Sequence, residues 1–178
     1  MNEGKLYHRV PKDMRDNILL PLSGIKDKHP DLYEKILLKY KGREHFLEDS
    51  VPSFYCDWKD VINFSPVHPS ILKEALEKEK GKLPEWEFFE IDPHILNKKD
   101  AIVYKFTNIG DKITKDDFEK YDPNKISQYS EMPQETIDYY KDEIKNGRVP
   151  FLFHKIPHVL YKGNIDISDE SKVKRIPV

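Results

Sequence analysis

Prolines recur along this chain and set the ends of most of the secondary-structure elements that its sequence predicts. The 178 residues include 13 prolines, and proline removes the N–H donor that the interior of a strand or helix needs. Pro11 therefore ends the β-prone run 5–10, whereas Pro30 and Pro69 follow histidines and suit the first position of a helix. The chain is expected to fold from short strands and helices in mixed order.

Hydrophobic spacing predicts about three helices and six or seven strands. Apolar residues recur at helical intervals after three prolines, and a glycine follows each run. The three predicted helices begin at Pro30, Pro69 and Pro133. β-branched and aromatic runs predict strands at 5–10, 61–65, 86–92 and 101–106, with two or three more within 149–178. The polar segment 108–129 is expected to be a solvated excursion. We therefore predict an α+β fold, a single domain over residues 1–178 with split mixed or antiparallel sheets.

The charge balance and the single cysteine narrow the classes of function. Lysine and arginine number 30 and aspartate and glutamate 32, a net charge of −2, whereas proteins that bind duplex DNA through its phosphates usually carry a basic excess. Cys56 has no second cysteine for an intrachain disulfide, which fits a reducing compartment. The sequence has no run of 18 apolar residues and no apolar secretory segment at its start. We expect a cytoplasmic protein with no membrane partner.

One six-residue phrase occurs near both ends of the chain. LYHRVP spans residues 6–11 and LFHKIP spans residues 152–157, and both are typical of a strand closed by proline. Side chains alternate along a strand, so His8 and His154 would each share a face with their apolar neighbours. If the two strands are neighbours, the two histidines face one cleft and are candidate catalytic residues. The alternative is that two half-buried edge strands share a common β composition.

Other arrangements that would carry chemistry are weak or missing. His154 and His158 have the four-residue spacing of a zinc pair on a helix, but Pro157 and its β-branched neighbours argue against a helix here. We therefore expect no metal site. Cys56 adjoins Asp57, whose charge raises the pKa of a thiol, so a buried structural cysteine is expected. With 7 glycines in the whole chain, a glycine-rich phosphate loop is excluded.

Four segments, taken in order, resemble the ADP-ribosyltransferase superfamily, which includes DNA-targeting ADP-ribosyltransferase toxins and RNA 2′-phosphotransferases. The first strand of that superfamily often reads Leu-Tyr-His, followed by a turn and a segment such as Ile-Leu-x-x-Gly-Leu, and LYHRVPKDMRDNILLPLSGIK is similar. INFSPVHPSILKEAL resembles the next core strand with its helix, and FFEIDPHIL resembles a strand that ends in acidic-Pro-x-x-Leu. FLFHKIPHVLYKG is similar to the late strand.

The resemblance implies a split α+β fold with a cleft that holds NAD between the first strand and the serine-bearing strand. By position, His8 or Arg9 would bind the nicotinamide ribose or a phosphate, and the planar guanidinium of arginine suits a phosphate because it donates in pairs. Ser65 would support the nicotinamide. The acceptor of the transferred group would be a protein or a nucleic acid.

The late strand departs from the superfamily pattern. A catalytic glutamate usually stands at its start, and this chain reads VPFLFHK there, without an acid. His154 is the nearest polar candidate. Cationic Arg9 and His154 would fit phosphate handling better than stabilisation of an oxocarbenium ion. Three readings stay open: a transferase without the glutamate, a phosphotransferase-like enzyme, and an inactive nucleotide binder.

A second hypothesis belongs to a different class, a non-catalytic module that docks a protein partner through an aromatic-rich surface. Its anchor would be FYCDW, residues 54–58, since tyrosine and tryptophan dominate the energetics of protein interfaces. Outward Tyr55 and Trp58 side chains would support docking, and inward packing would remove its main support. The transferase hypothesis instead needs its predicted site residues to lie close enough to share one ligand.

Overall fold

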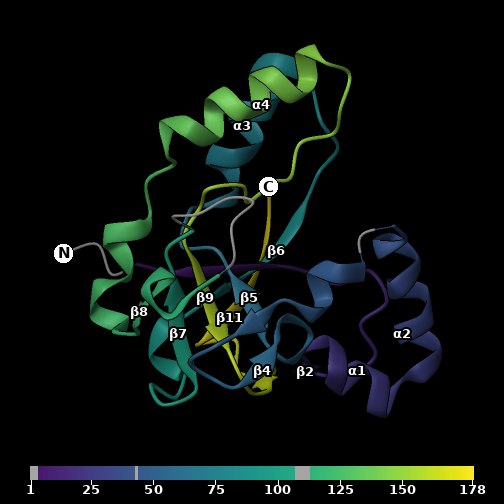
Figure 1. The fold of residues 1–178 in the computed structure, drawn as a ribbon, viewed down its shortest axis with the longest axis vertical. Helices are drawn as coiled ribbons and strands as arrows, with labels where there is room; N and C mark the ends of the chain where they lie inside the picture. The colour runs from purple at the N-terminus through teal and green to yellow at the C-terminus, as the bar shows by residue number, and fades with distance from the viewer. Residues whose placement is uncertain (1–3, 43, 107–112) are drawn as a thin grey trace.

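Two antiparallel sheets form the centre of the molecule (Figure 1). The computed structural model describes residues 4–42, 44–106 and 113–178. The first sheet has the order β1-β6-β11 and consists of β1 (Leu6–Arg9), β6 (Glu87–Ile91) and β11 (Val173–Pro177). The second has the order β5-β9-β7-β8 and consists of β5 (Ile62–Phe64), β9 (His158–Tyr161), β7 (Ala101–Tyr104) and β8 (Phe118–Lys120). Two further pairs are short: β2 (Ile18–Leu19) with β10 (Ile165–Asp166), and β3 (Ser50–Val51) with β4 (Cys56–Asp57).

The three predicted helices are present, and another helix precedes them. They are α2 (Pro30–Leu37), α3 (Pro69–Lys80) and α4 (Gln134–Lys145), and the additional helix is α1 (Leu22–Lys28). Figure 1 shows α3 and α4 together above the sheets, with α1 and α2 at the side of the molecule. The predicted α+β class, built on antiparallel sheets, is therefore confirmed.

Side chains from both sheets meet in one inner core. It is formed by buried residues that include Leu6, Phe64, Phe89, Ile91, Val103 and Val159. Because side chains alternate along a strand, the residue after Leu6 faces the other way. Tyr7 accordingly packs with Phe88 against Leu76 of α3 and Tyr140 of α4. The first sheet thus has the inner core on one face and the α3–α4 helices on the other.

Among the described residues, backbone hydrogen bonds join the two sheets at one residue pair. Tyr7 in β1 and Ser65, just after β5, form an antiparallel bridge. The N–H of Tyr7 donates to the carbonyl of Ser65 at 2.8 Å, and the N–H of Ser65 donates to the carbonyl of Tyr7 at 2.9 Å. We call this meeting of β1 and β5 the sheet junction.

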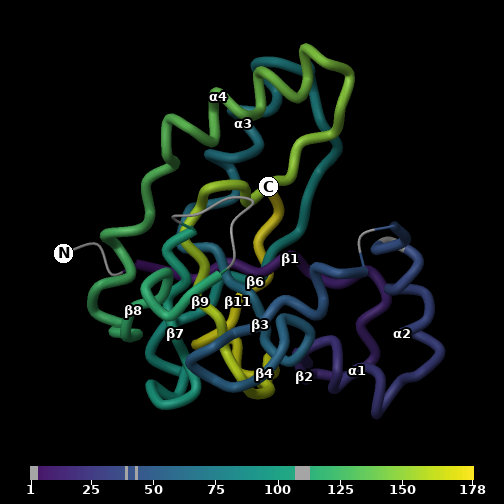
Figure 2. The backbone as a smooth tube through the Cα atoms, viewed as in Figure 1, coloured from purple at the N-terminus to yellow at the C-terminus, as the bar shows by residue number. Residues whose placement is uncertain are grey.

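The second copy of the repeated phrase is not a strand, which corrects the prediction for 152–157. Residues 152–155 form a turn, and Lys155 has a φ of 63°, which no strand residue adopts. The turn is held by α4, because the hydroxyl of Thr136 donates to the carbonyl of His154 at 2.8 Å and the phenol of Tyr140 donates to that of Leu152. Figure 2 shows this chain returning from the helices to the sheets. β9 begins only at His158, after the turn.

The prediction of a solvated excursion at 108–129 is also wrong over the part that the structure describes. Residues 108–112 lie outside the described residues. Residues 113–129 contain β8 and two 3₁₀ helices, Lys115–Asp117 and Pro123–Tyr129. Phe118, Tyr121 and Ile126 are buried. This segment is therefore part of the packed fold.

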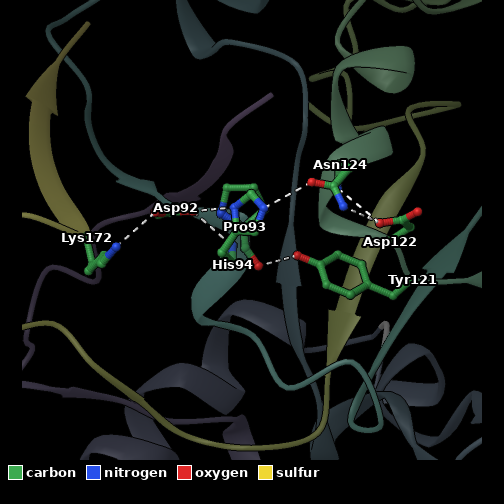
Figure 3. A network of polar contacts seen from close by, with 7 residues as sticks. All are labelled: Asp92, Pro93, His94, Tyr121, Asp122, Asn124 and Lys172. Carbon is green, nitrogen blue, oxygen red and sulfur yellow. Dashed lines mark hydrogen bonds and ion pairs between the residues drawn. The ribbon is translucent and has the colours of Figure 1, made fainter. Parts of the chain in front are cut away.

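A network of polar contacts fastens this segment to the end of β6 (Figure 3). The phenol of Tyr121 donates to the carbonyl of Pro93 at 2.6 Å. One oxygen of Asp92 accepts from the backbone N–H of His94 at 2.9 Å and lies 3.0 Å from its ring Nδ1. The other ring nitrogen of His94 lies 3.3 Å from the side-chain oxygen of Asn124. The short 3₁₀ helix Pro93–Ile95 is thereby tied to the 3₁₀ helix Pro123–Tyr129.

β11 is one of the two outer strands of the first sheet, and backbone hydrogen bonds hold it at both ends. Val178 and Trp86 exchange two backbone hydrogen bonds of 2.8 Å each, while the N–H of Val173 donates to the carbonyl of Asp169 at 2.9 Å.

No helix within the described ranges is long and apolar enough to cross a bilayer.

Candidate functional site

His8 lies at the sheet junction, one residue after the bridging Tyr7. Its ring Nδ1 is 2.8 Å from the carbonyl oxygen of Asn63, and its ring rests against Phe64 with centroids 5.6 Å apart. A carbonyl can only accept, so Nδ1 carries the proton and Nε2 presents a lone pair. Burial lowers the pKa of His8, although the bond to Asn63 works in the opposite direction. His8 is therefore a neutral imidazole with an acceptor nitrogen.

Arg9 points to the other side of β1. Its side chain is exposed, and the guanidinium carbon lies 5.4 Å from the centre of the Trp86 ring. Lys73 from α3 lies over the same ring at 6.0 Å. Since neighbouring side chains of a strand face opposite ways, His8 and Arg9 lie on different faces of the first sheet.

Ser65 is held in its own turn. The residue is 3% exposed, and its hydroxyl donates to the carbonyl of Val67 at 3.2 Å and accepts from the N–H of Val67 at 3.1 Å. Its backbone joins the sheets, as described above. Ser65 thus lies beside the first strand, as the resemblance implies, while its hydroxyl is already engaged.

His154 lies in the turn after α4. Its ring stacks on Tyr139 with centroids 3.7 Å apart and meets Phe106 edge-on at 5.8 Å. Burial, followed by the charge of Lys155, lowers its pKa. These contacts share no residue with those of His8, so the structure does not bring the two predicted catalytic histidines together.

His158 is the histidine that sequence reasoning set aside. It begins β9, is 9% exposed, and its Nδ1 donates to the carbonyl of Ile156 at 2.6 Å. Burial lowers its pKa to about 4, so the ring is neutral and Nε2 presents a lone pair, as in His8. Four aromatic rings surround it, those of Trp58, Tyr104, Phe106 and Phe153. The sequence feature that could have indicated this position is Pro157-His158-Val159, in which the histidine directly follows a proline and so can begin a new strand.

The two neutral histidines lie on opposite faces of the second sheet. His8 rests against Phe64, which faces the inner core together with its register partner Val159. His158 precedes Val159 and therefore faces the other way, towards Trp58 and Tyr104. The resemblance expects the catalytic position at the start of the late strand, and in the structure that strand starts at His158. His158 therefore stands where His154 was predicted to stand.

Two other features bear on the chemistry available. Burial raises the pKa of the Cys56 thiol, which leaves it a poor nucleophile at neutral pH. Within the described part of the chain, no three His, Cys, Asp or Glu side chains are grouped to hold a metal ion.

A hollow of about 350 Å³ lies at the opposite end of β9 and includes none of the predicted site residues. It is lined by loop residues of mixed charge, including Asp166, Asp169 and Lys172, around Tyr161. Because Tyr161 is the last residue of β9 and His158 the first, the hollow and the sheet junction are separate features.

Comparison of the chain with protein-family models, with curated proteins and with solved structures returned no match.

Proposed function

We propose that this protein is an ADP-ribosyltransferase-like protein that binds NAD or a related nucleotide at the sheet junction. One observation carries the proposal. The resemblance implies split sheets with the ligand held between the first strand and the serine-bearing strand. In the fold, β1 and β5 are joined by the backbone bridge between Tyr7 and Ser65 and by the bond from the His8 ring to the carbonyl of Asn63.

The state of His8 supports a particular role. Its Nε2 accepts a hydrogen bond, which suits a ribose hydroxyl and does not suit a phosphate oxygen. The exposed guanidinium of Arg9 has the chemistry that suits a phosphate, but it lies over Trp86 on the opposite face of the first sheet, so we do not assign it to the ligand that His8 binds. Ser65 would help to hold the nicotinamide only if its turn to Val67 opened, so we assign it mainly to the junction itself.

The reaction that such a site would serve is the transfer of ADP-ribose to a protein or nucleic acid. The bond between ribose C1′ and the nicotinamide nitrogen breaks, and its electron pair leaves with nicotinamide. C1′ then bonds to a nucleophile of the acceptor, which releases its proton to solvent. His158 faces Trp58 and Tyr104, away from the junction, so we assign it no role in this step.

Thermal melts with NAD test the binding proposal. Ligand at about 100 times its Kd adds about 2.7 kcal/mol, which raises Tm by roughly 5–10 °C for a chain of this size. We expect His8→Ala to weaken binding about tenfold, because one hydrogen bond to the ribose is lost. His45→Ala is the matched control, since His45 is exposed and far along the chain from β1. Wild-type protein that shows no shift at millimolar NAD would contradict the proposal.

One observation favours the alternative hypothesis that the protein docks a partner through an aromatic-rich surface. Tyr55 is 87% exposed and has a φ of 49°, an uncommon conformation for a bulky residue. Trp58, by contrast, packs against Tyr104 with ring centroids 5.6 Å apart, which removes half of the predicted anchor. A photo-crosslinking phenylalanine analogue placed at Tyr55 should then label a partner that the same analogue at exposed Ile71 does not. Equal labelling at both positions would count against docking.

A further inference from the structure

The hollow at the far end of β9, away from the sheet junction, has the size of a small-molecule site. Its volume of about 350 Å³ is at the lower end of the range for such sites. It is bordered by the 3₁₀ helix Pro93–Ile95, by the end of β9 and by the loop of residues 163–172. A molecule the size of one substituted six-membered ring would therefore fit in it.

One part of the hollow's wall is apolar and is held in place by a glycine. Ile95, Ile165 and the ring of Tyr161 form this part. A Cβ atom at Gly163 would lie 2.7 Å from the Tyr161 ring, far inside the normal contact distance of two carbon atoms. Only glycine therefore lets the ring lie against the backbone here, and the ring offers a ligand a fixed apolar surface.

The polar part of the wall includes two carboxylates whose orientation is fixed. One oxygen of Asp166 accepts from the N–H of Ser168 at 2.9 Å and from its hydroxyl at 2.6 Å. One oxygen of Asp169 accepts in the same way from Ser171, at 3.0 Å and 2.6 Å. These bonds lower the pKa of both carboxyl groups, so both are ionised at neutral pH. Among the described residues, no hydrogen bond reaches the second oxygen of either group, which is left to accept from a ligand.

The wall also carries hydrogen-bond donors. The amide of Asn164 can both donate and accept. The ammonium of Lys172 borders the hollow and makes a long contact of 3.4 Å with Asp92 (Figure 3). Its positive charge would repel a cationic ligand, and the carboxylates of Asp166 and Asp169 would repel an anion. The charges of the wall thus favour a neutral ligand over either kind of ion.

We propose that the hollow binds a neutral polyhydroxy compound, a sugar or a cyclic polyol. Such a molecule has an apolar C–H face, which would lie on the Tyr161 ring, and hydroxyl groups around its edge. A hydroxyl both donates and accepts, so the ligand can donate to the free oxygens of Asp166 and Asp169 and accept from Asn164 or Lys172. An ammonium only donates and a phosphate dianion only accepts, so neither uses both sets of groups. The site does not rest on the proposed nucleotide function.

Titration of the full chain with D-glucose, D-ribose and myo-inositol tests the site. We expect at least one of them to bind with a millimolar Kd and to shift the amide resonances of residues 163–172 in nuclear magnetic resonance spectra. Asp169→Asn replaces an acceptor oxygen by a donor and should weaken binding about tenfold, the effect of losing one hydrogen bond to a charged group. Asparagine forms the same turn with Ser171, so the fold is kept. Glu170→Gln is the matched control, because Glu170 is exposed in the same loop and is not one of the residues that line the hollow.

Gly163→Ala is a second variant, because its added methyl group would displace the Tyr161 ring without a change of charge. It should weaken binding as well. Putrescine and inorganic phosphate serve as charged probes. No shift in this loop with any of the three polyols at high millimolar concentration would overturn the site. Shifts with putrescine or phosphate alone would overturn the assigned class of ligand. Polyol binding that both Asp169→Asn and Gly163→Ala leave unchanged would overturn the hollow as its location.

Discussion

His158 and His8 show how burial fixes the chemistry of a single residue. Each ring donates from Nδ1 to a backbone carbonyl, that of Ile156 for His158 and that of Asn63 for His8. Each pKa is lowered by burial. Both residues are therefore restricted to hydrogen-bond acceptance at neutral pH. This restriction, more than their position in the sequence, determines what they can bind.

The lowered pKa of His158 predicts a loss of stability in mild acid. An unfolded histidine takes up a proton near pH 6.5, whereas folded His158 does so only near pH 4. Between these values the unfolded state binds more protons, so the free energy of unfolding falls as the pH is lowered. The loss attributable to His158 is on the order of 3 kcal/mol, and half-buried His8, whose pKa is also lowered, acts in the same direction.

Urea unfolding of the wild type and His158→Gln at pH 7, 6, 5 and 4 measures this effect. The variant keeps a polar side chain but cannot take up the proton, so its stability should depend less steeply on pH. Carboxylates contribute equally to both proteins and cancel in the comparison. Parallel curves over this range would show that His158 is not the group responsible.

At the scale of elements, local sequence signals predicted the helix starts correctly, whereas tertiary contacts determined the conformation of segments that the sequence pattern predicts wrongly. His68-Pro69 predicts the start of α3, and in the structure the His68 ring accepts from the N–H of Ser70. The phrase LFHKIP predicts a strand on composition, yet Thr136 and Tyr140 of α4 capture its carbonyls and bend it into a turn. Those partners are separated from it along the chain, so no pattern within the phrase reveals them.

The packed segment 113–129 was missed for the same reason, and Tyr121 is the residue that tests it. Its phenol satisfies the carbonyl of Pro93 in a buried position. Tyr121→Phe should lower the free energy of unfolding by about 0.5–1.5 kcal/mol, because the carbonyl of Pro93 loses the phenol and keeps only the longer hydrogen bond from the N–H of Leu96 at 3.3 Å. Tyr55→Phe, which removes an exposed hydroxyl, should change it little. Chemical denaturation compares the two, and equal effects would mean that the Tyr121 hydrogen bond contributes nothing.

For the whole molecule, the sequence predicted the class of fold and part of the candidate site. The short proline-bounded runs are sufficient to indicate α+β, and the resemblance places β1 beside the serine-bearing strand. The opposite orientations of His8 and Arg9, and the engagement of the Ser65 hydroxyl by Val67, depend on how the sheets meet. His158 was missed because the start of β9 is set by the turn before it.

The backbone of β11, an edge strand of the first sheet, affects how copies of the protein associate at high concentration. Along an antiparallel edge strand, the backbone N–H and C=O groups of successive residues point alternately towards the neighbouring strand and away from it. Val178 directs its groups towards Trp86. The backbone groups of Val173, Arg175 and Pro177 therefore point away from the sheet. The N–H of Val173 is already bound, and proline has none. An approaching strand would meet one free N–H in β11, that of Arg175, and the charged side chains of Lys174 and Arg175 are both exposed. Neighbouring copies are thus kept from joining edge to edge along β11, the first step towards fibre growth.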